Sequence, residues 1–298
     1  MTVSGPDAGF VLWQELLAEA TERLAAVGLE SAAVEARRIV VAAAGCDDAA
    51  WAAVLSRPAT RRGVASFDSM LARRTAGEPL QYVLGSWGFR TLDLFVDPRV
   101  LIPRPETEIV AGCALAELQR RAGGSMLLAA DLGCGSGAIG LSLAAERVDT
   151  EVICTDVSAG ALAVASANLA GLGRPAQRVR LAEGSWYEAL PGALRGRFDV
   201  IASNPPYVAA GSDVLPPEIA DHEPPVALYS GRTGLEATEV ILAGAPGWLA
   251  PGGAVVLEMS DGAAGRVRDL AHSAGLVDIA VHRDLAGCER VLVARRPA

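Results

Sequence analysis

The sequence predicts an α/β protein in which a mostly parallel sheet, covered by helices on both faces, follows a small helical bundle and a β-hairpin. Three observations lead to this fold class. Apolar residues near the N-terminus recur at three- and four-residue steps, which is typical of amphipathic helices. The period changes to two between Trp87 and Pro103. From Met126 onward, short apolar runs alternate with helical segments, as in a parallel sheet.

The first predicted unit, residues 1–85, is a small all-helical bundle. The helical spacing extends from about Phe10 to Leu84 and is carried by Trp13, Leu16, Leu17, Ala20, Leu24, Val27, Val34, Arg38 and Val41. Breaks in the pattern divide the region into several short helices; they fall at Gly28, Gly45 and Arg57-Pro58. No polar cluster in this region suggests catalysis, so we expect it to recognise a partner or simply to pack.

Residues 86–104 are predicted to form a β-hairpin that connects the two larger parts of the chain. Apolar and polar residues alternate from Trp87 to Pro103, and we expect Asp97-Pro98 to lie at the turn between the strands. The residues R-P-E-T-E then open a helix, because Pro105 suits a first helical turn and acids are favoured near the positive end of the helix dipole.

Residues 105–298 are predicted to form the α/β unit. Its strands are short apolar runs at Leu127–Ala130, Val152–Thr155, Val179–Ala182, Val200–Ala202 and Ala254–Leu257. Its helices are expected to begin near Gly137, Ser158, Leu235 and Ala263. The C-terminal stretch L-V-D-I-A-V-H-R-D-L-A-G-C-E-R-V-L-V-A predicts two more strands joined by a loop, which gives the sheet an antiparallel edge.

The composition disfavours several classes of protein. With 51% hydrophobic and 20% charged residues, the chain of 298 residues is expected to be a soluble globular protein. It has no uncharged apolar run of about 18 residues and no signal-peptide pattern, so we expect a cytoplasmic protein without membrane contacts. The five scattered cysteines and three dispersed histidines predict neither a disulfide framework nor a metal site. The formal net charge of −9 disfavours direct nucleic-acid binding.

A glycine-rich loop, D-L-G-C-G-S-G-A-I-G from Asp131 to Gly140, follows the first strand of the α/β unit. Glycines let a backbone turn tightly and approach a ligand, and the following helix offers free N–H groups. Because such sheets bind ligands at the carboxyl ends of their strands, we predict a nucleotide-type site at this loop. The loop also matches the dinucleotide pattern G-x-G-x-x-G, which is weak evidence on its own.

Two further residues bear on the nature of the ligand. Asp156 ends the second strand, where its carboxylate can accept both hydroxyls of an adenosine ribose, while Ser158 is available to cap the next helix. Trp186 follows the third strand and either lies on an adenine face or is a half-exposed core tryptophan. Asp156 alone is compatible with NAD, whereas an aspartate before the glycines, such as Asp131, is more usual in methyltransferases.

The stretch F-D-V-I-A-S-N-P-P-Y, from Phe198 to Tyr207, is a strand that ends in a rigid polar corner. Prolines cannot donate to a sheet ladder and their φ angle is fixed, so they stop a strand and stiffen the residues after it. The corner presents one amide side chain, Asn204, and one aromatic ring, Tyr207. It lies at the same predicted sheet edge as the glycine loop.

Together these motifs resemble those of class I S-adenosylmethionine-dependent methyltransferases that act on planar amino groups. N-P-P-Y is shared by methyltransferases of DNA adenine, of ribosomal RNA guanine and of protein glutamine. The I-P-R-P-E-T-E block (Ile102–Glu108), E-P-L-Q-Y-V-L-G (Glu78–Gly85), the late R-D-L-A-G-C-E-R-V segment and the helical first domain are similar to the HemK-type (PrmC) peptide chain release factor glutamine methyltransferases. The resemblance covers almost the full length, and E-T-E favours the release factor enzyme over the relatives that methylate a ribosomal protein glutamine.

The resemblance implies a Rossmann-like methyltransferase domain with a seven-stranded sheet at residues 105–298. It also implies S-adenosylmethionine as cofactor, S-adenosylhomocysteine as product, and methyl transfer to the glutamine amide nitrogen in the Gly-Gly-Gln motif of release factors. We expect the enzyme to be a monomer. The expected cofactor-binding residues are Gly133, Cys134, Gly135, Ser136, Gly137, Asp156, Trp186 and Asn204. Cys134 replaces a hydroxyl residue that is common in the family, at a position that contributes mainly backbone.

The corner suits the transfer of a methyl group to an amide. The side-chain oxygen of Asn204 and the backbone oxygen of Pro205 can each accept one N–H of a carboxamide, which aims its nitrogen. Pro205 and Pro206 hold these acceptors rigid, and Tyr207 can stack on the carboxamide. We therefore predict Asn204, Pro205 and Tyr207 as catalytic residues, and these three with Pro206 as substrate-binding residues. Glu106 and Glu108 either carry a proton away or serve as helix-start acids.

Other functions remain compatible with part of the sequence. Methylation of adenine or guanine in nucleic acid uses the same corner, and only the acidic balance argues against it. An NAD-dependent oxidoreductase explains the glycine loop but leaves N-P-P-Y unexplained. A binding module without turnover has no use for an intact Asn204 next to the glycine loop. Pro216–Leu228 is expected to form a proline-stiffened loop near the site, without assigned roles for its residues.

Overall fold

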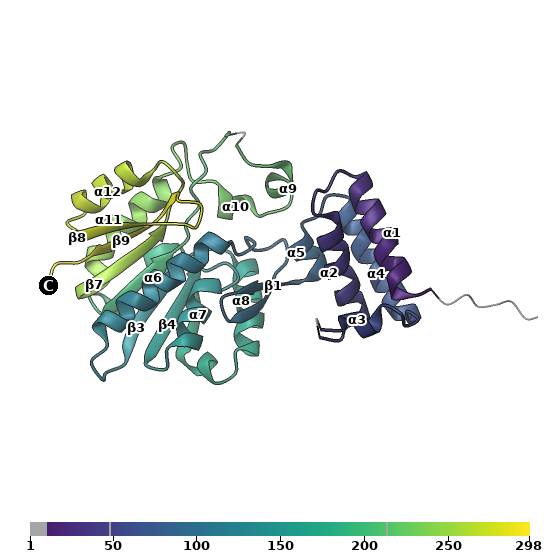
Figure 1. The fold of residues 1–298 in the computed structure, drawn as a ribbon. Coiled ribbons are helices and arrows are strands. Elements are labelled where there is room, and N and C mark those ends of the chain that lie inside the picture. The colour runs from purple at the N-terminus through teal and green to yellow at the C-terminus, as the bar shows by residue number, and fades with distance from the viewer. Residues whose placement is uncertain (1–10, 48, 213) are drawn as a thin grey trace, which may run out of the picture. The chain divides into compact units, whose positions relative to one another are not determined.

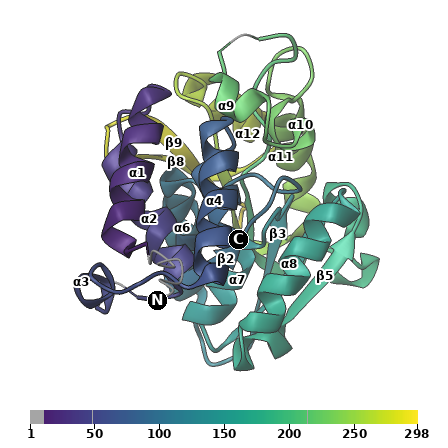
Figure 2. The same cartoon turned by 90° about the vertical axis from the view of Figure 1, so that its right-hand side faces the viewer.

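The chain divides between Gly85 and Ser86 into two units, Met1–Gly85 and Ser86–Ala298. The computed structural model, shown in two views in Figures 1 and 2, describes residues 11–47, 49–212 and 214–298. The β-hairpin predicted as a connector lies in the second unit, together with the sheet and the glycine loop. Each unit has its own buried apolar cluster.

The first unit is helical, as predicted. Its helices are α1 (Trp13–Ala26), α2 (Ala32–Ala44), α3 (Trp51–Val54), α4 (Arg61–Thr75) and α5 (Leu80–Leu84). The predicted breaks at Gly28 and Gly45 are confirmed, since both glycines follow a helix in the left-handed region, with φ of 85° and 63°. The core is built from side chains at helical spacing, including Leu16, Leu24, Ile39, Phe67 and Leu71.

One interface of this bundle contains a buried ion pair that the apolar pattern did not predict. Val27 and Val34, expected on the apolar face, are 53% and 60% exposed. Helix α2 instead turns Glu35 inward, where Arg74 of α4 donates to it from Nε at 2.5 Å and from Nη2 at 3.2 Å. A spacing rule cannot anticipate this arrangement, because the burial of Glu35 depends on a charged partner on another helix.

The second unit begins with a hairpin whose turn lies elsewhere than predicted. Strands β1 (Ser86–Phe89) and β2 (Leu92–Phe95) pair antiparallel around Arg90 and Thr91, so the expected turn at Asp97-Pro98 is wrong. Arg90 has a φ of 51°, which is unfavourable for a residue with a side chain. Tertiary contacts hold it there, because its N–H donates to Glu108 and its guanidinium binds Glu146.

Among the described residues of this unit, seven strands form one sheet in the order β5-β4-β3-β6-β7-β9-β8. The strands are β3 (Leu127–Leu132), β4 (Thr150–Asp156), β5 (Val179–Glu183), β6 (Phe198–Ser203), β7 (Leu249–Glu258), β8 (Val277–Arg283) and β9 (Glu289–Arg295). Strands β3 to β7 pair in parallel, and β9 pairs antiparallel with β7 and β8. The predicted mostly parallel sheet with an antiparallel edge is confirmed.

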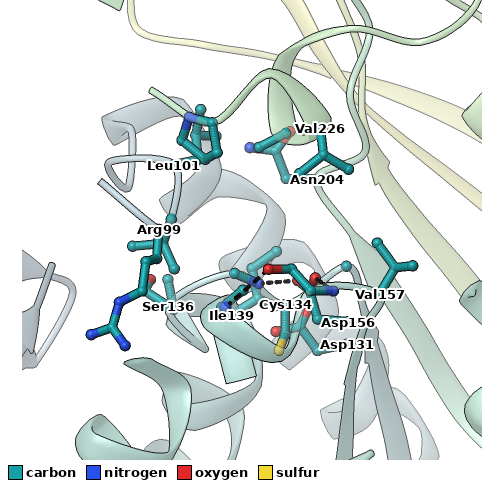
Figure 3. Close-up of a pocket in the computed structure, with 18 of the residues that line it drawn as sticks. Arg99, Leu101, Asp131, Cys134, Ser136, Ile139, Asp156, Val157, Asn204 and Val226 are labelled. Atoms are coloured by element: carbon teal, nitrogen blue, oxygen red, sulfur yellow. Dashed lines mark hydrogen bonds between the residues drawn. The ribbon is translucent and has the colours of Figure 1, made fainter. Parts of the chain in front are cut away.

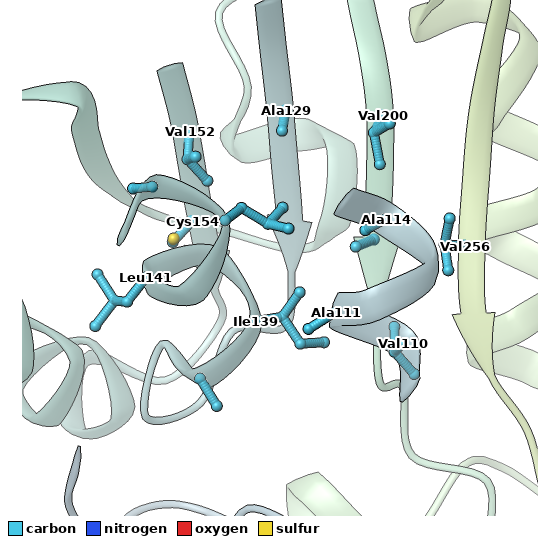
Figure 4. Close-up of a cluster of buried hydrophobic side chains, with 14 of the residues drawn as sticks. Val110, Ala111, Ala114, Ala129, Ile139, Leu141, Val152, Cys154, Val200 and Val256 are labelled. Atoms are coloured by element: carbon cyan, nitrogen blue, oxygen red, sulfur yellow. The ribbon is translucent and has the colours of Figure 1, made fainter. Parts of the chain in front are cut away.

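Helices cover both faces of the sheet. Helices α6 (Pro105–Arg121), α7 (Ala138–Glu146) and α8 (Ala159–Gly171) pack on one face, and α11 (Glu236–Trp248) and α12 (Ala264–Ser273) on the other. Figure 4 shows Val110, Ala111 and Ala114 of α6 packed over the middle strands. Small alanines let this helix approach the sheet closely. The remaining short elements are α9 (Pro217–Ala220), α10 (Pro225–Leu228) and the 3₁₀ turns Arg174–Arg178, Trp186–Ala189 and Gly192–Leu194.

The strand order creates a switch point between β3 and β6. From β3 the chain continues outward through β4 and β5, whereas β6 and β7 lie on the other side. Loops leaving β3 and β6 at their carboxyl ends therefore diverge and leave a crevice between them, which is where such sheets bind ligands. Within the described parts of the chain, no helix combines the length and the apolar content needed to cross a membrane.

Candidate active site

A cavity lies at the carboxyl edge of the sheet, over the switch point. Its walls come from the loops after β3, β4, β5 and β6, from the segment before α6 and from α10. Figure 3 shows Cys134, Asp131 and Asp156 on one side of this cavity and Asn204, Leu101 and Val226 on the other. The glycine loop and the corner at Asn204 thus lie on the same cavity, as their positions at one sheet edge predicted.

Asp156 ends β4 and holds the glycine loop in shape. Its Oδ2 accepts the N–H of Gly135 at 2.8 Å and its Oδ1 accepts the N–H of Ser158 at 2.9 Å. Ser158 itself caps α8, since its Oγ accepts the N–H of Ala161. Burial raises the pKa of Asp156. The aspartate is therefore not needed as a helix cap, and it lines the cavity with acceptor capacity to spare.

Asp131, at the end of β3, has a carboxyl oxygen without a partner. Its Oδ2 accepts the N–H of Gly140 at 2.8 Å, whereas its Oδ1 is buried with no hydrogen bond from the described residues. Burial, with a smaller contribution from the charge of Asp156, raises the pKa of Asp131 to about 7. Since a buried unpartnered acceptor is costly, an orphaned oxygen that lines a cavity indicates a ligand able to satisfy it.

Trp186 packs against the backbone of the glycine loop. A Cβ atom on Gly133 would lie 3.1 Å from Cζ3 of Trp186, and Gly133 has a φ of 70°, so only glycine suits this position. The indole is half-buried, contacts the apolar cluster under α11 and also lines the cavity. It is thus both a core tryptophan and a part of the cavity wall.

Cys134 contributes to the loop mainly through its backbone, as predicted for this position. Its N–H donates to Thr155 O at 2.8 Å, and its thiol is buried beside that of Cys154. The contact with Cys154 and burial both raise the pKa of the Cys134 thiol, so it stays protonated and unreactive at neutral pH.

Asn204 follows β6 and faces the cavity from the side opposite Asp156. The last residue of β6, Ser203, donates from Oγ to Leu132 O at 2.6 Å, which ties the corner to the start of the glycine loop. The Nδ2 of Asn204 donates to Oγ1 of Thr107 at 3.0 Å. No donor among the described residues reaches Oδ1, so this oxygen can accept a hydrogen bond from a ligand.

Not all of the predicted site residues line the cavity. Pro205, Pro206 and Tyr207 of the corner and Gly137 of the glycine loop do not, whereas the remaining ones do: Gly133, Cys134, Gly135, Ser136, Asp156, Trp186 and Asn204. Pro205 is buried, and within the described chain its backbone oxygen accepts no hydrogen bond. Tyr207 directs its hydroxyl to Glu258 at 3.4 Å. The roles predicted for these residues with a substrate stay predictions.

Two polar residues near the corner were not predicted as functional. Thr107 lines the cavity, and its hydroxyl donates to Glu258 at 2.6 Å. Glu258 is the last residue of β7 and is 2% exposed. The position of Glu258 at the carboxyl end of a central parallel strand could have marked it as a candidate, because such sheets bind their ligands at that edge. Glu108, by contrast, is occupied with the N–H of Arg90 and does not line the cavity.

The segment around α10 forms part of the cavity wall. Pro224, Val226 and Ala227 line it, although Val226 is mostly exposed. The segment is fastened by Glu223, which pairs with Arg104 and accepts the N–H of Ile102 at 3.1 Å. Two backbone hydrogen bonds of Val208 also join it to the corner after Tyr207.

The comparisons with known proteins agree with this architecture. The family model of the PrmC N-terminal domain matches residues 15–85, and that of the methyltransferase small domain matches residues 113–216. A release factor glutamine methyltransferase of Xylella fastidiosa (strain Temecula1) is 42% identical over 282 residues, which cover 95% of this chain and 97% of the relative. The chain belongs to the release factor glutamine methyltransferase family. The resemblance found in the motifs is confirmed.

A second member of the release factor glutamine methyltransferases, from Bordetella pertussis, is 45% identical over 227 residues, covering 76% of this chain and 81% of its own. Among solved structures, the hMettl16 catalytic domain in complex with a 3'UTR hairpin covers 78% of this chain and 81% of the solved chain, with a TM-score of 0.51 and 12% identity. At that identity the likeness shows the fold alone, and it confirms the predicted methyltransferase fold.

The cavity fits the type of cofactor that this family of methyltransferases uses. Asp156 has lone pairs that can accept hydrogen bonds from hydroxyl groups. The glycine loop leaves space that side chains would fill. Asp131 Oδ1 can accept a hydrogen bond from a donor group or bind a positive charge. Among the described residues, no group of three or more histidine, cysteine, aspartate or glutamate side chains is arranged to hold a metal ion.

Proposed function

We propose that this enzyme transfers a methyl group from S-adenosylmethionine to the side-chain amide nitrogen of the glutamine in the Gly-Gly-Gln motif of peptide chain release factors. The observation that carries the proposal is the orientation of Asn204, whose donor end is held by Thr107 while its acceptor end stays free beside the cavity. The near-full-length relatives that carry the name release factor glutamine methyltransferase support the substrate.

The residues that would hold S-adenosylmethionine are those that line the lower side of the cavity in Figure 3. Asp156 would accept the ribose hydroxyls, Trp186 would lie against the adenine, and the backbone of Gly133 to Ser136 would lie along the rest of the ligand. Asp131 would take the positive amino group. When bound, the cofactor supplies an electrophilic methyl group on a cationic sulfur.

The chain's own contribution is to position a weak nucleophile. An amide nitrogen is poorly nucleophilic because its lone pair is delocalised into the carbonyl. The Oδ1 of Asn204 and the backbone oxygen of Pro205 would accept the two N–H groups of the glutamine amide, which aims the nitrogen into the cavity and favours positive charge on it. Both acceptors are fixed before the substrate arrives, so little reorganisation is needed.

The buried surroundings strengthen these contacts. Pro205 and Tyr207 are largely removed from water, and burial and the neighbouring Glu258 raise the pKa of the Tyr207 hydroxyl, which keeps it neutral. A neutral ring beside the corner can cover a carboxamide without adding negative charge. The substrate amide would thus be held where the local dielectric constant is low and each hydrogen bond is stronger than in water.

The proposal is tested by incubating the purified enzyme with methyl-labelled cofactor and a release factor. We expect label on the factor, with a mass increase of one methylene unit that fragmentation locates on the Gly-Gly-Gln glutamine. A factor in which this glutamine is replaced by glutamate serves as the control and should stay unlabelled. Label that appears instead on ribosomal protein or on DNA, with none on the release factor, would contradict the proposal.

A further inference from the structure

A chain of buried hydrogen bonds leads from Asn204 into the protein. Its Nδ2 donates to Thr107 at 3.0 Å, and the Thr107 hydroxyl donates to Oε2 of Glu258 at 2.6 Å. The Tyr207 hydroxyl donates to the other carboxylate oxygen, Oε1, at 3.4 Å. Thr107 and Glu258 are 151 residues apart in the sequence and come from the first turn of α6 and the end of β7.

The direction of each hydrogen bond in this series is determined by the Glu258 carboxylate at its end. An ionised carboxylate can only accept, so Thr107 has to give its single proton to Glu258. The Thr107 oxygen is then left as an acceptor, and the Asn204 group that meets it has to be the NH₂. Oδ1 of Asn204 is consequently turned toward the cavity, where the substrate amide needs an acceptor.

We propose that Glu258, acting through Thr107, is a positioning residue that determines which end of the Asn204 amide faces the substrate. This inference rests on the proposed function, since the orientation matters only if Asn204 has to accept a hydrogen bond from the substrate amide. Glu258 does not line the cavity, so its influence on the reaction passes through Thr107.

Protonation of Glu258 reverses the donor and acceptor roles along this series of hydrogen bonds. A protonated Glu258 can donate from Oε2 while Oε1 still accepts from Tyr207. Thr107 then accepts from Glu258 and gives its own proton to Asn204, whose amide turns its oxygen inward and its NH₂ toward the cavity. An NH₂ group there repels the N–H of the substrate amide, so the enzyme is expected to lose turnover while the cofactor side of the cavity stays intact.

The surroundings of Glu258 make this change accessible at ordinary pH. Burial raises the pKa of Glu258 to about 7; the charge of Glu106 on α6 adds to the rise, and Thr107, Tyr207 and Arg290 oppose it. Arg290, at the start of β9, is held by Asp284 and does not form an ion pair with Glu258. Arg104, at the cap of α6, pairs with Glu223. Glu258 thus stays dependent on its hydrogen bonds for ionisation.

The test uses Glu258→Gln, Thr107→Val and Thr107→Ser in the full-length enzyme. Glutamine matches the protonated carboxyl in shape and hydrogen bonding, so kcat of Glu258→Gln should fall by about 100-fold, the order seen when one preorganised hydrogen-bonding group is lost. Thr107→Val breaks the relay and should also lower kcat, and Thr107→Ser, which keeps the hydroxyl, should restore most of it. The affinity for S-adenosylhomocysteine, measured by calorimetry, should change by less than about threefold.

The pH profile separates positioning from mere stability. The wild-type kcat should decrease as the pH falls through about 7, as Glu258 becomes protonated, and Glu258→Gln should lack this limb. Glu117→Gln is the control, because Glu117 is also a buried glutamate, 7% exposed, but pairs with Arg120 and Arg295 at the far end of α6. That variant should lose stability and keep the wild-type pH profile. An unchanged limb in Glu258→Gln would overturn the proposal.

A readout without substrate distinguishes failure of this proposal from failure of the proposed function. The side-chain amide NMR signals of Asn204, assigned from their loss in Asn204→Asp, should titrate in the wild-type enzyme with a midpoint near that of Glu258. They should stay constant with pH in Glu258→Gln. Asn204 signals that ignore pH would overturn the positioning role even if release factors are methylated. Titrating signals in an enzyme that does not methylate release factors would leave the positioning chain standing and refute only the function.

Discussion

Arg104 and Glu223, 119 residues apart in the sequence, form an ion pair that joins the cap of α6 to the segment before α10. The glutamate side chain is 1% exposed and also accepts the N–H of Ile102. Both segments are walls of the cavity. The pair therefore ties two walls of the cavity to each other.

Replacing Glu223 by glutamine is expected to loosen this wall. The amide can still accept from Ile102 but leaves Arg104 without its counter-charge. Because Arg104 is partly exposed and can regain water, we expect a loss of about 1–2 kcal/mol in the free energy of unfolding, below the value for a fully buried pair. Urea unfolding measures this, and KM for the release factor should rise with it. Asp221→Asn, an exposed neighbour on the same segment, should change neither quantity.

Removing the amide of Asn204 is expected to affect turnover and binding unequally. Asn204→Ala takes away the acceptor that we propose acts on the substrate amide in the transition state, so kcat should drop by about 100-fold or more. The dissociation constant for S-adenosylhomocysteine should stay within about threefold of the wild type. Single-turnover kinetics and calorimetry provide the two numbers. Equal losses in both would mean that Asn204 chiefly organises the cavity.

Asp156→Asn is expected to show the opposite pattern. The neutral amide keeps one acceptor but would lose the charged hydrogen bonds that we propose to the ribose hydroxyls, and it disturbs the bond to Gly135. Charged hydrogen bonds contribute about 1.5–3 kcal/mol, so the dissociation constant for the cofactor should rise by at least about tenfold. At saturating cofactor, kcat should be recovered. A turnover defect that persists at saturation would instead place Asp156 in the chemical step.

Asp131 predicts a specific dependence of stability on pH. Its pKa is raised to about 7 in the folded enzyme from an ordinary value of 3.8, so the unfolded chain releases this proton first as the pH rises. The stability associated with the protonated carboxyl is complete below about pH 4 and is lost progressively as the pH approaches 7. Asp131→Asn removes this penalty and should raise the melting temperature of the cofactor-free enzyme by a few degrees at pH 8.

The same comparison at pH 4 provides the control. There Asp131 is protonated in the folded enzyme, and in the unfolded chain it is close to its midpoint at the ordinary value of 3.8, so the advantage of asparagine should be much smaller than at pH 8. Differential scanning calorimetry at both pH values measures the two differences. A gain of equal size at pH 4 and pH 8 would show that packing, and not the charge of Asp131, is responsible.

The sequence was sufficient to predict features that depend on local pattern. The strands from β3 to β7, the helix starts near Gly137 and Ser158, and the pairing of the last two strands all follow from periodicity and turn residues that lie close together in the chain. The glycine loop and the corner at Asn204 were predicted to meet because parallel strands bring their carboxyl ends to one edge.

Features that depend on distant partners were not predictable in this way. The hairpin turn at Arg90 is selected by Glu108 and Glu146, which hold a conformation that arginine disfavours by itself. The inward orientation of Glu35 depends on Arg74. In the sequence, Thr107 is one residue of a motif and Glu258 is the end of a strand, because only the finished fold places one hydroxyl between Asn204 and a buried carboxylate.

The acidic wall formed by Asp131 and Asp156 bears on which form of a methyl donor the cavity should prefer. The donor carries a positive sulfur, whereas the demethylated product is a neutral thioether, and the cavity wall holds two acids close together. A cation entering this wall relieves the mutual repulsion of Asp131 and Asp156, and its loss of charge removes that attraction. We therefore expect the two acids to favour a cationic donor over its neutral product, and this preference to increase as Asp131 ionises.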